Sequence, residues 1–465
     1  MKRPGKSSKA FSAGGLVVLL VFAFAGHAFG NKKPKFAYVA NQCGNVSCTG
    51  SGNVSAYTID SATGALTMVP GSPFAAGSLP FSVAVDPSGK FAYVANAISN
   101  NVSAYSIDST TGVLSPVPGS PFSAGLFPVS VAVDPSGKFA YVANQFSSNV
   151  SAYSIDSTTG ALSPVPGSAF AAGSNPFSVA VDPSGKFAYV ANRVFSNISA
   201  YSIDSTTGAL SPVPGSPFAS GSDPFSVAVD PSGKFAYVAN QLSSNVSAYS
   251  IDSTTGALSP VPGSPFSAGL FPVSVAVDPL GKFAYVSNFS SGNILAYTIN
   301  STTGALSPVP GSPFASEPSA ISVAVDPSGK FAYVVNQGFS NVSAYSIDST
   351  MGALSPVPGS PFASGFFPLS VAIAGEAVAS PAELITNLIN TVNSLNLQPG
   401  IANSLDAKLQ AAQASLAANH TITTCNEMNA FIHEVMAQSG KELTVAQADQ
   451  LIAQANFIKT GLGCP

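Results

Sequence analysis

Charged side chains are scarce in this sequence. Asp, Glu, Lys and Arg make up 8 % of its 465 residues, against roughly 25 % in an average soluble protein. The polar surface must therefore consist mainly of Ser, Thr, Asn and turn backbone. No basic cluster occurs beyond the N-terminus, which excludes the electrostatic footprint of a nucleic-acid-binding protein. We expect no nucleic-acid partner.

Long apolar runs are also nearly absent. The run over residues 14–25 is too short to span a bilayer comfortably. Four basic residues precede it and small residues follow it, as in an export signal. We predict a signal peptide over 1–30, cleaved after Ala28 or Gly30, with an uncleaved anchor as the alternative. The mature chain keeps 13 of the 17 basic residues against 21 acidic ones. It is expected to be secreted or extracytoplasmic, in a bacterial periplasm or at the cell surface, with no membrane span.

Cysteine is rare as well, and its four copies are Cys43, Cys48, Cys425 and Cys464. An even number in an exported chain favours two disulfides, although four cysteines allow three pairings. Proximity in sequence favours Cys43–Cys48 and Cys425–Cys464. Zinc is the weaker interpretation, because no histidine lies near the first pair and His433 is the only plausible partner near Cys425. We therefore expect no metal and no cofactor.

The abundant feature is a repeat. Residues 80–122 contain four apolar-alternating runs, each closed by a turn signal rich in Asp, Pro and Gly. Four strands joined by tight turns predict one antiparallel meander. The FAYV run recurs at a step of 55 residues and then at five steps of 48. It begins at Phe36, Phe91, Phe139, Phe187, Phe235, Phe283 and Phe331.

The two ends of the repeat region complement each other. The chain begins its repeats on a second strand, at Lys35, and ends them on a lone first strand, SVAIAG, over Ser370–Gly375. A ring explains this split, because the last strand can pair into the blade that the N-terminus began. Closure also removes exposed sheet edges. We predict an all-β seven-bladed β-propeller over residues 31–376, with four-stranded antiparallel blades.

Antiparallel topology sorts the loops of such a ring into two faces. The turns DPSGK and STTG lie on one side and hardly vary, so we name that side the constant face. The loops after the second strands and the connections between blades lie on the other side, the variable face, and differ from blade to blade. Binding residues tend to lie on loops of a rigid scaffold. Function is therefore expected on the variable face.

Apolar side chains on that face form the predicted binding surface. An exposed apolar patch often marks an interaction site. The alternative is that the rings fold inward and plug the axial opening. The candidate binding residues are Phe127, Phe146, Arg193, Phe195, Leu242, Phe271, Phe289 and Phe339.

Three charges depart from the repeat on the variable face: Arg193, Asp223 and Glu317. They are weak candidates for a catalytic or ligand-binding cluster. The simpler interpretation is that they are solvated loop residues, with a weak surface ion pair between some of them. The repeated aspartates at the constant turns are explained by turn capping.

After Ser380 the periodicity becomes helical. Apolar residues at 384, 385, 388, 389, 392 and 395 form one stripe. Pro399-Gly400 ends this segment, and three further amphipathic segments follow at about 401–418, 424–438 and 444–461. Four short helices over 377–465 predict a small bundle. A bond between Cys425 and Cys464 would tie its tail.

The YVAN motif, as at Tyr93–Asn96, resembles the YVTN family of propellers. That family is similar to lactonase-type seven-bladed propellers, which include 6-phosphogluconolactonase. The resemblance implies the fold and, as an activity, lactone hydrolysis by His, Arg and Glu or Asp near the ring centre. No histidine lies between His27 and His420, so the enzymatic residue set is incomplete. The C-terminal part, with AFIHEV at Ala430–Val435, resembles the FIMAH-type helical module.

Together these patterns favour a binding scaffold that uses its variable face, with a protein, glycan or small molecule as partner. The alternative is a lactonase-type hydrolase acting on a sugar or other lactone. An axial calcium site is a third interpretation, but no spaced carboxylate motif supports it.

Overall fold

In the computed structural model, the described residues are 34–45, 50–375, 381–395, 397–418, 420–462 and 464. The predicted signal peptide at 1–30 lies outside them. The strands within these residues form seven antiparallel sheets, followed by four helices. The seven-bladed propeller and the helical part that follows it are confirmed.

Each blade is built outward from the ring axis. The innermost strands are β5 (Pro80–Val85), β10 (Pro128–Val133), β15 (Pro176–Val181), β20 (Pro224–Val229), β25 (Pro272–Val277), β30 (Ala320–Val325) and β35 (Phe366–Gly375). The second strands are β1 (Pro34–Cys43), β6 (Phe91–Asn96), β11 (Phe139–Asn144), β16 (Phe187–Asn192), β21 (Phe235–Asn240), β26 (Phe283–Asn288) and β31 (Phe331–Asn336). The third strands are β2 (Asn53–Ile59), β7 (Asn101–Ile107), β12 (Asn149–Ile155), β17 (Asn197–Ile203), β22 (Asn245–Ile251), β27 (Asn293–Ile299) and β32 (Asn341–Ile347).

The fourth, outermost strand is divided in two. In the second blade, β8 pairs with one end of β7 and β9 pairs with the other end. The VPGSP turn separates the two pieces, with Gly119 at φ 84°, a conformation that suits glycine. The paired segments are β3 (Leu66–Met68) and β4 (Phe74–Ala75), β8 (Leu114–Pro116) and β9 (Phe122–Ser123), β13 (Leu162–Pro164) and β14 (Phe170–Ala171), β18 (Leu210–Pro212) and β19 (Phe218–Ala219), β23 (Leu258–Pro260) and β24 (Phe266–Ser267), β28 (Leu306–Pro308) and β29 (Phe314–Ala315), and β33 (Leu354–Pro356) and β34 (Phe362–Ala363).

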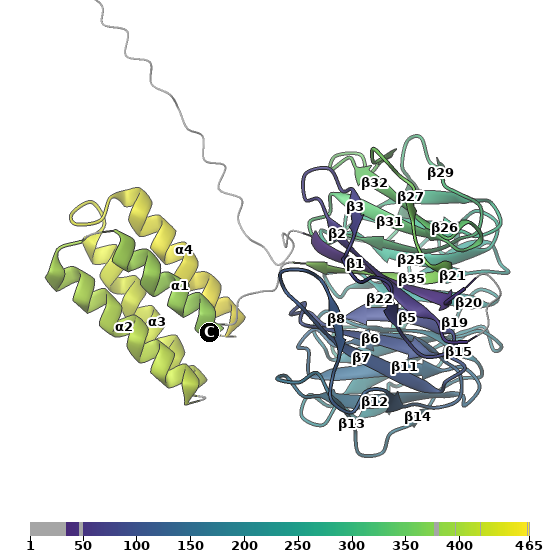
Figure 1. The fold of residues 1–465 in the computed structure, drawn as a ribbon, viewed down its shortest axis with the longest axis horizontal. Helices are drawn as coiled ribbons and strands as arrows, with labels where there is room; N and C mark the ends of the chain where they lie inside the picture. Colours follow the sequence, from purple (N-terminus) through teal and green to yellow (C-terminus); the bar gives the residue numbers. More distant parts are fainter. Residues whose placement is uncertain are drawn as a thin grey trace, which may run out of the picture.

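The ring closes as the split ends predict. β35 pairs antiparallel with β1, so that Tyr38 lies opposite Ala372 and Pro34 lies opposite Gly375. Figure 1 shows this pair of strands from the two ends of the propeller sequence lying side by side. The N-terminal and C-terminal ends of the propeller therefore share one blade.

Neighbouring blades are joined by buried tyrosines. The Tyr93 hydroxyl donates to the carbonyl oxygen of Gly160 in the next blade at 3.0 Å. The Tyr105 hydroxyl donates to the carbonyl oxygen of Ala75 in the preceding blade at 2.6 Å. A Cβ atom at Gly160 would lie 2.3 Å from the Phe91 ring, so glycine is required where the blades meet. The same contacts repeat around the ring and explain the fixed aromatic positions.

Serine hydroxyls satisfy the inner edge of the ring. An innermost strand has no neighbour on its axial side, so some of its N–H groups need other partners. The Val131 N–H donates to Ser82 Oγ of the preceding blade at 3.3 Å, and the Val179 N–H donates to Ser130 Oγ at 3.1 Å. The conserved spacing of these serines in the repeat is therefore structural.

The repeated aspartates cap turns. Asp86 is buried and accepts hydrogen bonds from the backbone N–H groups of Ser88, Lys90 and Phe91. Asp108 is exposed and accepts from the N–H groups of two threonines that follow it. These backbone hydrogen bonds lower the pKa of Asp108. Capping by aspartate on the constant face is confirmed.

The C-terminal part contains α1 (Pro381–Ser394), α2 (Pro399–Ala417), α3 (Thr421–Gln438) and α4 (Val445–Gly461). Their apolar faces form one core that includes Leu388, Leu409, Phe431 and Leu451. α3 begins at Thr421, three residues before the predicted start. No helix within the described ranges has the length and apolar character needed to cross a membrane.

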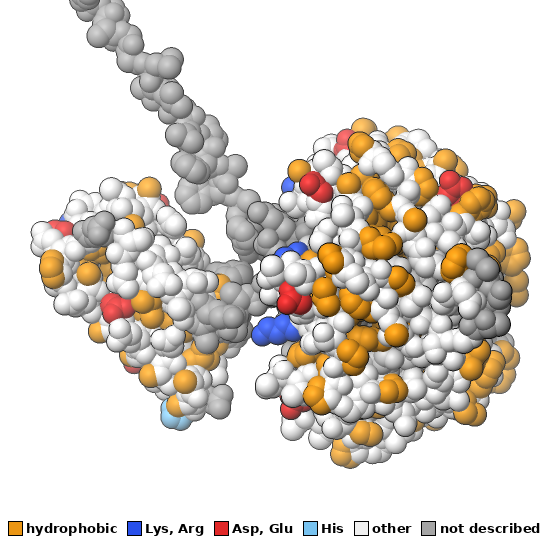
Figure 2. All heavy atoms as spheres, in the orientation of Figure 1, with side chains coloured by type: hydrophobic (Ala, Val, Ile, Leu, Met, Phe, Trp, Pro, Cys, Tyr) orange, Lys and Arg blue, Asp and Glu red, His pale blue; other side chains and the backbone are white. Residues whose placement is uncertain are grey.

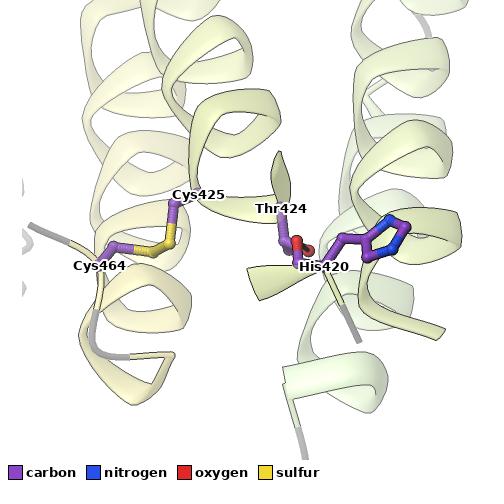
Figure 3. Close-up of a disulfide and its surroundings, with 4 residues drawn as sticks. All are labelled: His420, Thr424, Cys425 and Cys464. Atoms are coloured by element: carbon purple, nitrogen blue, oxygen red, sulfur yellow. Dashed lines mark hydrogen bonds between the residues drawn. A yellow bond between two sulfur atoms is a disulfide. The ribbon is translucent and has the colours of Figure 1, made fainter. Parts of the chain in front are cut away.

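One predicted disulfide joins α3 to the residue after the last helix. Cys425 and Cys464 are bonded, with Cα atoms 5.6 Å apart (Figure 3). On the same turn of α3, the Thr424 hydroxyl donates to the carbonyl oxygen of His420. Cys43 is also disulfide-bonded, and its predicted partner Cys48 lies outside the described residues.

Candidate functional site

The axial opening on the variable face is filled by phenylalanines. Phe81, Phe177 and Phe225 occupy the second position of their innermost strands. The ring centroids of Phe81 and Phe177 are 5.4 Å apart, and those of Phe177 and Phe225 are 4.2 Å apart. Phe81 and Phe177 belong to blades two positions apart, so they meet across the axis. The centre of this face is therefore aromatic.

Arg193 lies over this aromatic cluster. Its guanidinium carbon is 4.6 Å from the Phe177 ring centroid and 4.9 Å from that of Phe225. Arg193 also forms a bidentate pair with Asp223, with Nε–Oδ1 at 2.5 Å and Nη2–Oδ2 at 2.7 Å. The Arg193 side chain is 26 % exposed and the Asp223 side chain 11 %. The guanidinium is thus held by two rings and one carboxylate.

The Arg193–Asp223 pair is a charged version of an inter-blade contact. Gln145 and Asn175 occupy the same two positions one blade earlier, and the Gln145 Nε2–H donates to Asn175 Oδ1 at 2.7 Å. Asn175 and Asp223 both have a left-handed backbone, with φ 61° and 58°. This conformation is tolerated by Asn and Asp. The pair therefore has a structural role as well as a chemical one.

Free hydrogen-bond donors remain around this pair. Arg193 Nη2 also donates a hydrogen bond to Gln241 Oε1, at 3.1 Å. This contact orients the Gln241 amide nitrogen away from Arg193. Among the described residues, neither Arg193 Nη1 nor Gln241 Nε2 has a hydrogen-bond partner. Both Asp223 carboxylate oxygens and Gln241 Oε1 each accept a hydrogen bond from Arg193, while N–H donors are available.

A surface pocket of about 470 Å³ lies at this position. Its ionisable lining residues are Arg193 and Asp223, whose charges cancel. The pocket is lined by Asn175, Arg193, Val194, Ser196, Ser222, Asp223 and Leu242. It is a neutral pocket with polar walls and an apolar rim.

Apolar side chains are exposed on several loops of the variable face. Phe146, Phe195, Leu242 and Phe339 are each more than half exposed. Phe146 stacks on the half-buried Phe127 at 4.5 Å between centroids. The predicted loop rings therefore lie mainly outward, and the innermost strands supply the axial plug instead. Phe271 is partly exposed and Phe289 is half-buried.

The propeller separates its charges by face. The lysines that precede the second strands lie on the constant face, and so do twelve turn aspartates. Figure 2 shows Lys side chains on the left side of the propeller and hydrophobic side chains along its right edge. The lysines are Lys35, Lys90, Lys138, Lys186, Lys234, Lys282 and Lys330. The aspartates are Asp60, Asp86, Asp108, Asp134, Asp156, Asp182, Asp204, Asp230, Asp252, Asp278, Asp326 and Asp348.

Of the three predicted charge candidates, the structure brings two together. Arg193 and Asp223 form the bidentate pair, which is more buried than the exposed pair we expected. Glu317 lies two blade connections further around the ring and makes no ion pair with a described residue. The described residues also contain no group of three His, Cys, Asp or Glu side chains that could hold a metal.

Sequence reasoning missed the aromatic cluster that packs against Arg193 and the polar residues that pair across the blade boundary. Phe81, Phe177 and Phe225 were not singled out, although the second position of the innermost strand varies among Phe, Val, Ile and Leu. That variation within a nearly constant strand was the available signal. Gln241 and Asn175 carried no signal of their own, because each matters only through a partner in the preceding blade.

The seven-bladed ring places this chain among the β-propellers. The family model described as "Lactonase, 7-bladed beta-propeller" matches residues 31–121, 82–175, 165–269 and 266–365. The chain therefore belongs to this lactonase family of seven-bladed β-propellers.

Solved structures share the fold at low sequence identity. A proposed 6-phosphogluconolactonase from Bacteroides uniformis has a TM-score of 0.64 and 18 % identity, covering 73 % of this chain and 99 % of its own. The periplasmic gluconolactonase of Pseudomonas aeruginosa has a TM-score of 0.61 and 18 % identity, with the same coverage. A protein from Lactobacillus plantarum has a TM-score of 0.60 and 21 % identity, again covering 73 % and 99 %. No curated protein gives a significant match.

Proposed function

We propose that this chain is an extracytoplasmic binding protein whose variable face holds a neutral, hydroxyl-rich ligand of the sugar class without cleaving it. The observation that carries the proposal is the pocket around Arg193. Its charges cancel, so it offers no net attraction to an ion. N–H donors on Arg193, which lines the pocket, and on the adjoining Gln241 match the acceptor oxygens of a sugar ring or hydroxyl group.

The location outside the cytoplasm is part of this proposal. The basic and apolar N-terminal residues form an export pattern. A disulfide joins Cys425 and Cys464, and disulfides persist in oxidising compartments. Fractionation of cells that express the full chain would test it: we expect the mature protein in the periplasmic or extracellular fraction.

Lactone hydrolysis is the second candidate function, because the family and two similar structures carry lactonase names. Ring opening needs a group that activates water and a donor for the developing oxyanion. Arg193 could serve as the donor. Asp223 is the carboxylate in the pocket, and Arg193 occupies both of its oxygens. Fold alone does not supply the missing base, so we favour binding.

One experiment separates the two functions. Calorimetric titration of the mature protein with neutral monosaccharides, oligosaccharides and sugar lactones is combined with a hydrolysis assay on the same lactones. We expect heat of binding from at least one ligand and no hydrolysis above the rate without protein. The Arg193→Gln, Asp223→Asn double variant should lose this binding.

A matched control is Leu280→Ser on the constant face, which restores the residue of the other DPSGK turns and should leave binding intact. Hydrolysis that disappears in Asp223→Asn would establish the lactonase function instead. Absence of both binding and hydrolysis across the panel would refute the proposed function.

A further inference from the structure

We infer that a second copy of this chain docks on the variable face, so that two propellers associate face to face. The observation is a ring of exposed apolar side chains, each more than half exposed, on loops spread around that face. We name it the apolar ring; its members are Ile98, Phe146, Phe195, Leu242, Leu270 and Phe339. Side chains of this size rarely gather on one exposed surface unless they contact a partner.

The charge of the face restricts the partner. Arg193 and Asp223 neutralise each other, and Glu317 is the other charge on the variable face within the described residues. A strongly charged partner would gain little attraction here and would lose its own hydration. The surface that complements the apolar ring is therefore neutral and apolar, as the apolar ring itself is.

The chain's own ends begin on the opposite face. Pro34 and Gly375 are opposite each other in the β1–β35 pair. The adjoining Lys35 donates to the carbonyl oxygen of Ser109, which lies in an STTG-type turn of the constant face. The segments that precede and follow the propeller thus start on the constant face. Neither segment starts on the variable face.

A protein surface fits this face better than a lipid bilayer. The apolar side chains alternate with Ser, Asn and Gln and with irregular loop backbone, as in the QFSS loop at Gln145 and the QLSS loop at Gln241. In hydrocarbon these polar groups would lose their hydrogen bonds at a cost of several kcal/mol each. Another copy can pair such groups at the rim while the apolar side chains pack together. A neutral apolar surface is also complementary to itself, which suits an isologous dimer.

Sedimentation equilibrium of the mature full chain tests this inference, from low micromolar concentrations to about 100 µM. We expect a reversible monomer–dimer equilibrium. The triple variant Phe146→Ser, Phe195→Ser and Phe339→Ser should raise the dimer dissociation constant by roughly 100-fold or more, because each copy loses three interface side chains. These three side chains do not line the Arg193 pocket, so the triple variant leaves the residues of the pocket unchanged.

The matched control removes exposed apolar side chains from the constant face. Leu280→Ser and Met351→Thr restore the residues that the other repeats carry at these exposed positions, and the dimer should be unchanged. The inference is overturned if the wild-type chain stays monomeric throughout. It is also overturned if both variants weaken the dimer equally, or if the monomer binds neutral phosphatidylcholine vesicles through the three phenylalanines.

Discussion

The free-energy coupling between Arg193 and Asp223 can be measured by replacing them with the residues of the preceding blade. Replacing Arg193 by Gln and Asp223 by Asn copies the Gln145–Asn175 pair of the preceding blade. Asp223 has the same left-handed backbone as Asn175. Arg193 and Gln145 each follow the second strand of their blade directly. The double variant is therefore expected to fold with its inter-blade contact rebuilt as a neutral hydrogen bond.

The free-energy costs of the two single variants should sum to more than the cost of the double variant. Arg193→Gln leaves a carboxylate that is 11 % exposed without its two donors, which costs about 2–3 kcal/mol. It also removes the stacking on Phe177 and Phe225, worth about 1 kcal/mol. Asp223→Asn leaves a guanidinium that is 26 % exposed and partly hydrated, so we expect about 1–2 kcal/mol.

The double variant should lose only about 1–2 kcal/mol, because the stacking is lost but a Gln–Asn hydrogen bond forms. The coupling free energy between the two positions, the sum of the two single costs minus the cost of the double variant, is then about 3–4 kcal/mol. Urea unfolding of the wild type, the two single variants and the double variant measures it. A coupling below about 0.5 kcal/mol would refute the reasoning, because independent sites add within that margin.

Three further predictions concern the ring, its acid sensitivity and the helical part. Gly208→Ala should destabilise the propeller by about 3 kcal/mol, because the new Cβ would lie 2.4 Å from the Phe139 ring at φ 76°. Gly215→Ala, with similar φ but a nearest contact of 3.4 Å, should cost only about 1 kcal/mol in the same thermal unfolding assay. Backbone hydrogen bonds lower the pKa of the six exposed turn aspartates; their stabilisation is present above about pH 4 and is lost as the pH falls through the lowered folded-state values. Asn already occupies the equivalent turn of one blade, at Asn300. Replacing the six aspartates with Asn should make the melting temperature depend less on pH below about pH 4. Cys464→Ala removes the disulfide to Cys425, whose two cysteines are separated by 39 positions in sequence, and should destabilise the helical part by about 4 kcal/mol. Circular dichroism should show that the helices unfold at a lower temperature while the β signal is unchanged.

The ring could be predicted because its evidence is periodic. Seven FAYV runs and a lone SVAIAG strand at the end require a closed array, whatever the details of each loop. The helices from Pro381 onward could be predicted for the same reason, since an apolar stripe at helical spacing is a local signal. The division of each outer strand was missed, because a Pro-Gly turn within one short edge strand resembles the end of that strand.

The pocket was harder to predict, because it depends on contacts between blades. Arg193 and Asp223 stood out as departures from the repeat, but their bidentate geometry follows from a left-handed residue in one blade facing a loop of another. Gln241 contributes only because Arg193 reaches it across the blade boundary. The aromatic cluster under Arg193 depends on Phe81 and Phe177 meeting across the axis, which the 96 residues that separate them in sequence do not indicate.

The closing pair of strands also determines how the propeller responds to force. Pro34 and Gly375 lie opposite each other at the same end of the antiparallel β1–β35 pair. Tension between these two residues therefore acts across the strands rather than along them, and it loads the hydrogen bonds of the pair one after another. The ring should open by unzipping from this end at low force, while the other six blades keep their pairing. A molecule pulled through only one of its ends would not load this seam.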